Sequence, residues 1–248
     1  MTPPLIIFDL DGTLAESKQA VTPEMAALLA RLLAETYVGI ISGGALQQFL
    51  KQVVDRLSGE ADKSKLYLLP TSGASLYEYR GCDWRKVYEE RLTEEEMRTI
   101  AAAMRVAASE THAIDFSAPA YGERIEYRGG QVTLSALGQH APLDKKLLWD
   151  PTRAKREALR AAIAPQLPGF SVKIGGKTSV DITKQGVDKA YGIHQLCERL
   201  GIKESAALYV GDELGPGGND EAVYKTDAKT KAVKDPSETA KFIVSLLA

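Results

Sequence analysis

The sequence predicts an α/β fold in which a parallel sheet, covered by helices, is interrupted by a separate α+β unit. Towards both ends of the chain, apolar runs typical of buried strands alternate with helical patterns. In the middle, the apolar runs are shorter and alternate with polar residues. A chain of 248 residues is long enough for this arrangement. We expect a core made of residues 1–80 and 186–248, with the inserted unit at residues 81–185.

The first part of the chain supplies three strands and two helices to the expected parallel sheet. Thr22 and Pro23 are suited to the cap and the first position of a helix. Residues 76–79 form a further short run, for which we expect an edge strand. The predicted elements are strands at residues 5–10, 37–41 and 66–69, a helix that begins after Thr22 and a helix over residues 45–57.

The middle of the chain predicts two hairpin-like strand pairs and two helices. Thr93 and Glu96 have the spacing of a capping box ahead of an alanine-rich helix. The other predicted elements are strands at 125–127 and 131–137, a helix over 150–164, and strands at 171–174 and 179–183. The α/β pattern then resumes with a helix over 187–200, a strand at 206–210 and a helix over 236–247.

Composition excludes several classes of function. The formal net charge of -2 provides no basic field for nucleic acid or a membrane surface. No apolar run approaches the roughly 20 residues of a membrane span, and the first run is too short for a signal peptide. The two cysteines, Cys82 and Cys197, predict free thiols and a reducing compartment. We therefore expect a cytoplasmic protein.

Two carboxylates follow the most apolar strand of the chain. Asp9 and Asp11 are separated only by Leu10, and Gly12 and Thr13 come next. Ligands of open α/β sheets bind beyond the carboxyl ends of the strands, which is where this pair is expected. Taken alone, the pattern is equally compatible with two aspartates that cap a turn.

The chemistry of a carboxylate pair favours phosphoryl transfer. Neighbouring carboxylates repel near an apolar core unless a cation or a proton compensates them. A Mg²⁺ ion takes oxygen ligands and keeps a substrate phosphate in its shell. One carboxylate can attack phosphorus to give an aspartyl phosphate, and the second can protonate the leaving oxygen if its pKa is raised.

Such a site also needs a hydroxyl, a lysine and further acids at the ends of other strands, and the sequence has them in order. Ser42 follows the second strand, and Lys189 lies early in the helix after the inserted unit. Asp212 follows a later strand, with Asn219 and Asp220 shortly after it. Each residue alone has an ordinary structural explanation as a turn, cap or solvated residue. Their joint occurrence at the strand ends of one sheet favours the functional interpretation.

These motifs resemble the haloacid dehalogenase (HAD) superfamily of phosphohydrolases and phosphomutases. The resemblance implies a Rossmannoid parallel-sheet core and an inserted α+β cap of the C2B type, as in subfamily IIB. It implies that Asp9 is the nucleophile and that Asp11 is the general acid/base. It also implies that Ser42 and Lys189 hold phosphoryl oxygens, with Gly43 and Gly44 beside the substrate. The implied Mg²⁺ ligands are Asp9, Asp11 through its backbone carbonyl, Asp212, Asn219 and Asp220.

A narrower resemblance is to the eukaryotic-type phosphomannomutase family. It is carried by residues 216–220, 175–181 and 186–191, and by Arg128 with the glycines at 129, 130 and 138. The implied substrate contacts of the cap are Arg128, Gln139, Lys146, Ser179 and Asp181. The resemblance further implies a hexose phosphate as the small-molecule substrate and a homodimer formed through the cap.

Three positions depart from the family pattern of arginines that grip the distal phosphate. Gln139, Lys146 and Lys18 stand where the family has arginine. The two lysines keep the positive charge but lack the planar guanidinium group that binds phosphate through two hydrogen bonds, and Gln139 carries no charge. Weaker binding of the distal phosphate favours hydrolysis of the aspartyl phosphate. The sequence therefore favours a sugar phosphatase, with a phosphomannomutase or phosphoglucomutase as the alternative and a non-catalytic sugar-phosphate sensor as a further one.

Overall fold

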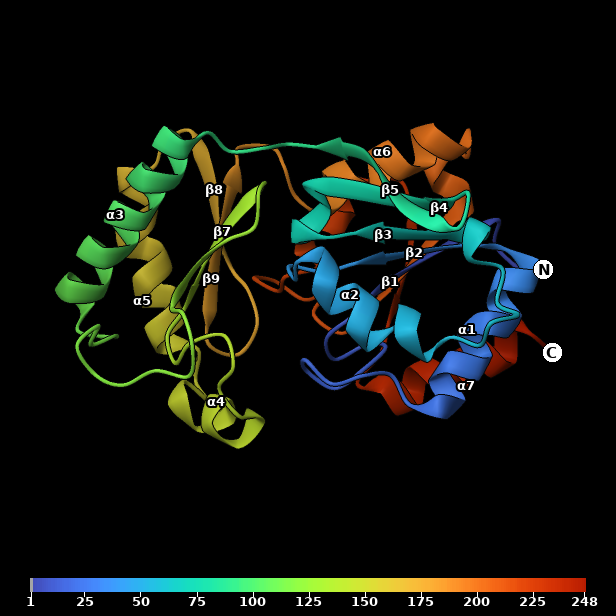
Figure 1. Cartoon of the computed structure of the whole chain (residues 1–248), viewed down its shortest axis with the longest axis horizontal. Helices are drawn as coiled ribbons and strands as arrows, with labels where there is room; N and C mark the ends of the chain where they lie inside the picture. The colour runs from blue at the N-terminus through green and yellow to red at the C-terminus, as the bar shows by residue number, and fades with distance from the viewer. Residues whose placement is uncertain (1) are drawn as a thin grey trace. The chain divides into compact units, whose positions relative to one another are not determined.

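The computed structural model describes residues 2–248, which divide into two compact units. The core unit comprises the chain up to Glu89 together with Asp188–Ala248, and the inserted unit comprises Glu90–Val187 (Figure 1). The first division falls after Glu89, later than the expected residue 80, because the strand Asp83–Glu89 pairs with the sheet of the core unit.

The core unit is a seven-stranded sheet with helices on both faces. Its strand order is β11-β10-β1-β2-β3-β4-β5; the pairs from β11 to β3 are parallel, and β4 and β5 are added antiparallel. The elements are β1 (Leu5–Asp9), α1 (Pro23–Glu35), β2 (Tyr37–Ile41), α2 (Leu46–Gln52), β3 (Leu66–Leu69), β4 (Ser75–Arg80), β5 (Asp83–Glu89), α6 (Lys189–Leu200), β10 (Ala207–Gly211), β11 (Lys229–Ala232) and α7 (Pro236–Leu246).

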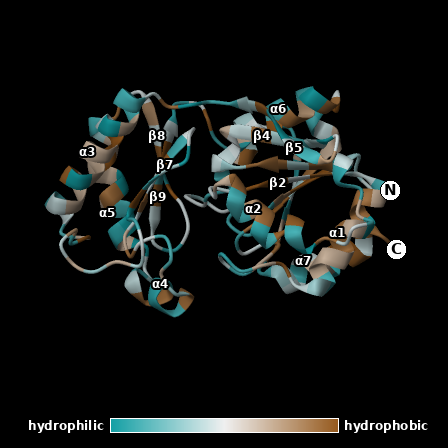
Figure 2. Ribbon diagram, in the orientation of Figure 1, coloured by the Kyte–Doolittle hydropathy of each residue, from teal (hydrophilic) through white to brown (hydrophobic). Residues whose placement is uncertain are grey.

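Alternate residues of β1 enter two different apolar clusters, as expected for a strand with a residue period of two. Ile6 and Phe8 belong to the cluster that contains buried leucines of α1 and Ile243 of α7. Leu5 and Ile7 belong to the cluster that contains Ile193 and Leu196 of α6. Because both faces are covered, the central strands read as continuous apolar runs, and Figure 2 colours the strands around β2 as hydrophobic.

The predicted strands and caps of the core unit are confirmed, with two differences. The Thr22 hydroxyl accepts a hydrogen bond from the Met25 amide at the start of α1. The helix expected over residues 45–57 ends at Gln52 and continues only as a short 3₁₀ turn. The edge-strand prediction for residues 76–79 is wrong, because β5 pairs with the far side of β4.

The inserted unit is a four-stranded antiparallel sheet, of order β6-β7-β9-β8, with α3 and α5 on one face (Figure 1). Val132 and Val180 point into an apolar cluster shared with Met104 of α3 and Leu159 of α5. The elements are α3 (Glu94–Thr111), β6 (Ile125–Tyr127), β7 (Gln131–Ser135), α4 (Leu143–Trp149), α5 (Ala154–Ile163), β8 (Phe170–Ile174) and β9 (Ser179–Lys184). The capping box of Thr93 and Glu96 is present, and the short helix α4 was not predicted.

The cysteines and the helix lengths can be compared with the expectations from composition. Cys82 and Cys197 are both free thiols. Over residues 2–248, no helix combines the length and the apolar character that crossing a membrane requires.

Asp150 fixes the start of α5, which begins later than the sequence predicts. Its carboxylate, of which 2% is exposed, accepts hydrogen bonds from the Lys155 and Arg156 amides at 3.1 Å and from Arg156 Nε at 2.9 Å. The Arg156 guanidinium also donates to the Gly176 carbonyl at 2.9 Å, which ties α5 to the turn between β8 and β9. Burial acts to raise the pKa of Asp150, but Arg156 and the amide donors outweigh it and hold this pKa below the ordinary 3.8.

Replacement of Asp150 by asparagine should therefore destabilise the protein in a pH-dependent way. We expect Asp150→Asn to lower the free energy of unfolding by about 2–4 kcal/mol near neutral pH, because it leaves Arg156 without its buried counter-ion. A carboxyl whose folded pKa is lowered stabilises the fold above its unfolded pKa, and this stabilisation is lost as pH falls through the folded pKa. Denaturant unfolding at pH 7 and near pH 3 should show the difference from wild type shrinking at the lower pH.

The control is Glu157→Gln on the same helix, where the ion pair with Arg160 is exposed. It should change the free energy of unfolding by less than about 1 kcal/mol. A difference between Asp150→Asn and wild type that stays constant over this pH range would contradict the assignment.

Candidate active site

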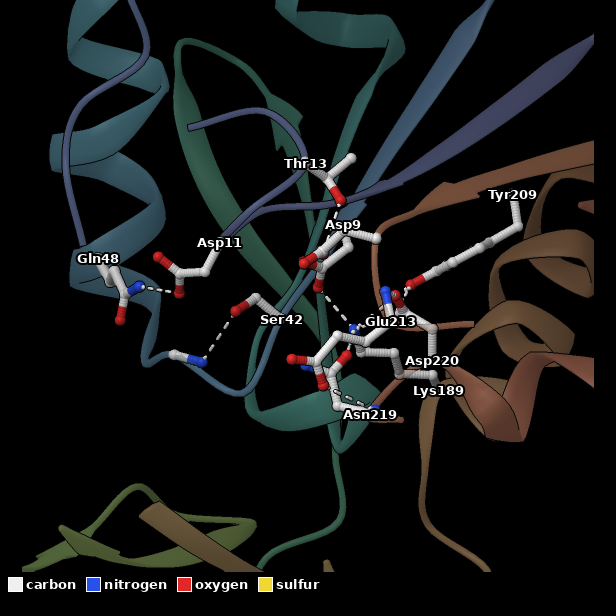
Figure 3. A network of polar contacts seen from close by, with 12 residues as sticks. Asp9, Asp11, Thr13, Ser42, Gln48, Lys189, Tyr209, Glu213, Asn219 and Asp220 are labelled. Atoms are coloured by element: carbon white, nitrogen blue, oxygen red, sulfur yellow. Dashed lines mark hydrogen bonds and ion pairs between the residues drawn. The ribbon is translucent and has the colours of Figure 1, made fainter. Parts of the chain in front are cut away.

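The carboxyl end of β1 carries a buried ion pair between residues 180 positions apart. Asp9 ends β1, and its Oδ1 accepts a hydrogen bond from Lys189 Nζ at 2.6 Å (Figure 3). Only 3% of the Asp9 side chain and 4% of the Lys189 side chain are exposed. Asp188 caps α6 by accepting from the Ala190 and Tyr191 amides, so Lys189 is held in the first turn of this helix. The predicted nucleophile and the predicted lysine thus lie together.

Two further side chains from the loop after β10 hold the lysine. Lys189 Nζ donates to Asp220 Oδ1 at 2.5 Å and to Asn219 Oδ1 at 3.0 Å. Asp220 is fully buried, and its second oxygen accepts from the Glu213 amide at 3.0 Å. These oxygens are therefore engaged with Lys189 and the loop, where they orient the ammonium group. The metal-ligand role of Asn219 and Asp220 stays a prediction.

Tyr209 is a member of this network that sequence reasoning missed. Its hydroxyl donates to Asp220 Oδ1 at 2.5 Å and lies 3.3 Å from Lys189 Nζ. Burial, followed by the charge of Asp220, raises the pKa of Tyr209 well above its ordinary value, so the hydroxyl keeps its proton. Tyr209 sits in an apolar strand run, where a tyrosine carries no local signal of function.

With its carboxyl groups ionised, the site carries more negative than positive charge. Burial raises the pKa of Asp9 well above its ordinary value; Lys189 opposes this shift, and the charges of Asp220 and Asp212 add to it. Burial, followed by the charge of Asp220, raises the pKa of Asp212 to about 6. Burial acts to lower the pKa of Lys189, but Asp220 and Asp9 outweigh it and raise this pKa. Three acids around one ammonium group leave an excess that a bound cation can compensate.

The oxygen atoms at this edge fit a hard divalent cation such as Mg²⁺. Asp9 Oδ2 is buried and has no hydrogen-bond partner within residues 2–248. Asp212 Oδ1 accepts from the Thr13 hydroxyl at 3.0 Å. Asp9, Asp212 and the backbone carbonyl of Asp11 are the groups that would hold the ion. Among the described residues, no three or more His, Cys, Asp or Glu side chains are grouped so that they could hold a metal ion.

Gly12 provides the close approach between the first loop and Asp212. Its φ of +99° favours glycine, and a Cβ at this position would lie 2.4 Å from Asp212 Oδ2. The glycine of the first motif is therefore required both by the backbone conformation and by the neighbouring carboxylate.

The side chain of Asp11 is turned towards α2 and away from Lys189 (Figure 3). Its Oδ2 accepts from Gln48 Nε2 at 2.9 Å, and its Oδ1 accepts from the backbone amide of Lys18 at 2.5 Å. Sequence reasoning missed Gln48, since a glutamine in a helical pattern gives no sign of such a contact. The predicted acid/base is thus close to the nucleophile in sequence but engaged with other partners.

Ser42 follows β2 at the same edge of the sheet and is buried. Asp9 is in register with Ile41, so the loop that starts at Ser42 begins beside the end of β1. The Gly44 amide donates to the Ser42 hydroxyl at 3.4 Å, and Gly43 lies between them. The predicted substrate-binding role of this loop is compatible with its position and stays a prediction.

Of the five predicted substrate contacts in the inserted unit, Ser179 and Asp181 lie on β9, Arg128 follows β6, Gln139 follows β7, and Lys146 lies on a helix. Arg128 Nη2 donates to Glu126 at 2.6 Å and to Gln139 Oε1 at 3.0 Å. The Thr133 hydroxyl donates to Asp181 Oδ1 at 2.8 Å. In the register of β7 and β9, Asp181 is opposite Thr133 and Ser179 is opposite Ser135, on the face away from the apolar cluster. Lys146 is buried on the separate helix α4.

Comparison with known families identifies the chain. The sequence profile of the eukaryotic phosphomannomutase family matches residues 25–248. The chain belongs to the eukaryotic phosphomannomutase family. A phosphomannomutase of Saccharomyces cerevisiae is 27% identical over 98% of this chain and 93% of its own length. Human phosphomannomutase 1 is 24% identical over 95% of this chain and 88% of its own length.

Solved structures support the same fold for this phosphomannomutase-family protein. The IMP-nucleotidase of Plasmodium falciparum superposes with a TM-score of 0.74 at 16% identity, over 99% of this chain and 70% of that chain. A haloacid dehalogenase-like hydrolase of Bacteroides thetaiotaomicron gives a TM-score of 0.63 at 16% identity, over 98% and 99%. The chain therefore has the HAD-like Rossmannoid core with an inserted cap, and its family membership makes it an enzyme.

The position of Gly12 leads to a prediction about metal binding in this phosphomannomutase-family protein. Gly12→Ala should weaken Mg²⁺ binding about tenfold, because the new Cβ displaces Asp212 Oδ2. Titration of the thermal unfolding midpoint with Mg²⁺ measures this affinity without turnover, since a ligand of the native state raises the midpoint by mass action. The matched control is Gly59→Ala, where a Cβ would meet no atom within 4 Å. Equal Mg²⁺ responses of the two variants would overturn the assignment.

Proposed function

We propose that the chain is a phosphohexomutase, which moves a phosphoryl group between two positions of a hexose phosphate through an aspartyl phosphate on Asp9. The observation that carries the proposal is the buried Lys189 ammonium group shared between Asp9 and Asp220. The phosphomannomutase relatives over nearly the full chain support transfer between sugar positions. They favour the mutase over the hydrolysis that the sequence pattern placed first.

In the first half of the reaction, Asp9 attacks one of the two phosphorus atoms of a hexose 1,6-bisphosphate, and a hexose monophosphate is left. Its Oδ2 is buried without a donor, so its lone pairs are available to form the O–P bond. The bond between phosphorus and the sugar oxygen breaks, and Asp11 gives a proton to that oxygen. Lys189 neutralises charge that develops on the phosphoryl oxygens, assisted by the Ser42 hydroxyl. When bound at Asp9 and Asp212, Mg²⁺ would supply further positive charge for the same oxygens.

In the second half, the free hydroxyl of the hexose monophosphate, bound the other way round, attacks the aspartyl phosphate, and the bisphosphate forms again. Asp11 takes the proton of this hydroxyl, the Asp9–phosphorus bond breaks, and the carboxylate is restored. For both proton transfers, the Asp11 side chain has to leave its contacts with Gln48 and the Lys18 amide. A mutase also has to exclude water from the aspartyl phosphate while the sugar turns round.

Hydrolysis is the second candidate, and Gln139 is the observation that favours it. Gln139 is buried, and its side-chain oxygen accepts from Arg128. A neutral amide at a position where the family has arginine offers no charge to a second phosphate. A hexose bisphosphate that binds less tightly leaves the site more readily, and water can then attack the aspartyl phosphate.

One assay separates these two reactions. The enzyme is incubated with Mg²⁺, mannose 1-phosphate or glucose 1-phosphate, and a trace of the corresponding 1,6-bisphosphate. A mutase accumulates the hexose 6-phosphate without release of inorganic phosphate, and this is the expected result. Inorganic phosphate formed at the rate of substrate loss would establish hydrolysis instead. Metal-dependent binding of the sugar phosphates without either product would support a non-catalytic sensor.

Replacement of the two buried ion-pair residues tests the roles assigned to them. Asp9→Asn should abolish turnover with the fold intact, because an amide cannot form the aspartyl phosphate. Lys189→Ala should lower kcat on the order of 10²–10³-fold, as expected for loss of one pre-organised charge. Circular dichroism checks the fold of both variants. Substantial turnover by folded Asp9→Asn would remove Asp9 as the nucleophile.

A further inference from the structure

Tyr209 places a hydroxyl inside the network that holds the catalytic lysine. We propose that Tyr209 is a positioning residue for phosphoryl transfer: by donating to Asp220, its hydroxyl keeps the Lys189 ammonium group shared between Asp220 and Asp9. This inference rests on the proposed phosphoryl transfer at Asp9, and it concerns a residue to which the motif pattern gives no role.

More oxygen atoms surround the Lys189 ammonium group than it has N–H bonds to donate. Four oxygen atoms of the described residues lie within 3.3 Å of Lys189 Nζ: they belong to Asp220, Asp9, Asn219 and Tyr209. An ammonium group has three N–H bonds, so it cannot serve all four equally. The Tyr209 oxygen is the most distant of them, and its own proton is directed at Asp220. Lys189 therefore donates to Asp9, Asp220 and Asn219.

The carboxylates of Asp220 and Asp9 compete for the Lys189 ammonium group. Asp220 Oδ1 accepts at 2.5 Å both from Lys189 and from Tyr209, whereas Asp9 Oδ1 accepts from Lys189 at 2.6 Å. A carboxylate oxygen that serves two donors attracts each of them less strongly. Both Asp220 and Tyr209 are fully buried, so water does not screen this effect. Without the hydroxyl, Lys189 should be drawn towards Asp220 and away from the oxygens of Asp9 and of a transferring phosphoryl group.

Packing around the Tyr209 ring keeps its hydroxyl directed at Asp220. Tyr209 lies in β10, an interior strand between β11 and β1, and its ring is fully buried in the apolar cluster that contains Ile193 and Leu196. The backbone at Gly211 leaves room for the pair, because a Cβ there would lie 2.4 Å from Asp220 Oδ2 and 2.8 Å from Tyr209 Cε1. The strand thus presents the phenol to Asp220 in one fixed orientation.

The test is Tyr209→Phe, which removes the hydroxyl and keeps the ring. We expect kcat to fall about tenfold, the effect of one hydrogen bond to a charged group, with KM changed less than about twofold. Inhibition by orthovanadate, which imitates the five-coordinate transition state, should weaken by the same factor as kcat. The control is Tyr67→Phe, a buried tyrosine of β3 outside the network, and it should leave kcat unchanged.

A double-mutant cycle tests whether the hydroxyl acts through Asp220. In an Asp220→Asn background, Tyr209→Phe should have no further effect on kcat. Full additivity of the two changes would overturn the proposal. So would a Tyr209→Phe variant with lower thermal stability but wild-type kcat, because the hydroxyl would then be only structural. If Tyr209→Phe does not fold, replacement of Tyr209 by 3-fluorotyrosine alters donor strength at nearly constant shape, and an unchanged kcat would overturn the proposal.

A second substrate distinguishes failure of the role proposed for Tyr209 from failure of the proposed function. The same comparison is made with p-nitrophenyl phosphate, whose cleavage needs Asp9 and Lys189 but no sugar. A tenfold lower kcat for Tyr209→Phe on this substrate supports the proposal even if wild type turns over no hexose phosphate, in which case the proposed substrate is wrong. Equal kcat values for wild type and Tyr209→Phe on both substrates overturn the role of Tyr209 and leave the proposed function standing. Absence of turnover by wild type on both overturns both.

Discussion

The buried ion pair between Lys189 and Asp9 is the interaction on which the site depends. Removing two charges from water is costly unless each finds a partner and the remaining polar atoms are satisfied. The core sheet meets this requirement because β1 lies between β10 and β2, so that the loops after all three strands start at one edge. Asp220 and Asn219 then complete the shell around the ammonium group. A residue 180 positions from Asp9 is thereby fixed at hydrogen-bond distance from it.

The same ion pair explains why the aspartates of the first loop have different surroundings. Asp9 is buried against Lys189, whereas Asp11 is partly exposed and accepts from Gln48 and a backbone amide. One carboxylate is thus held rigidly with one free oxygen, and the other is held by neutral donors that it can exchange. This division suits a nucleophile that must not move and an acid/base that must reach two different sugar oxygens in turn.

Much of the fold could be predicted because its signals are local. The Thr22 and Thr93 caps, the apolar strand runs and the acidic motifs each depend on neighbours in sequence, and each is found. The failures depend on tertiary contacts. Nothing local shows that β5 would cover the edge of β4 or that Asp150 would delay the start of α5. The contacts of Tyr209 and Gln48 were not predicted for the same reason, since their partners are distant in sequence.

The proposed bond making and the proposed recognition of a second phosphate depend on different residues. All groups assigned to bond making lie in the core unit; of the three departures from arginine, Gln139 and Lys146 lie in the inserted unit and Lys18 lies in the core unit. Arg128 already shares its guanidinium with Glu126, a carboxylate that offsets part of its charge. Under the proposed mechanism, the mutase reaction needs affinity for a second phosphate, whereas formation of the aspartyl phosphate does not. We therefore expect the charge at Gln139, Lys146 and Lys18 to influence the fate of the aspartyl phosphate, and the Lys189–Asp9 pair to govern its formation.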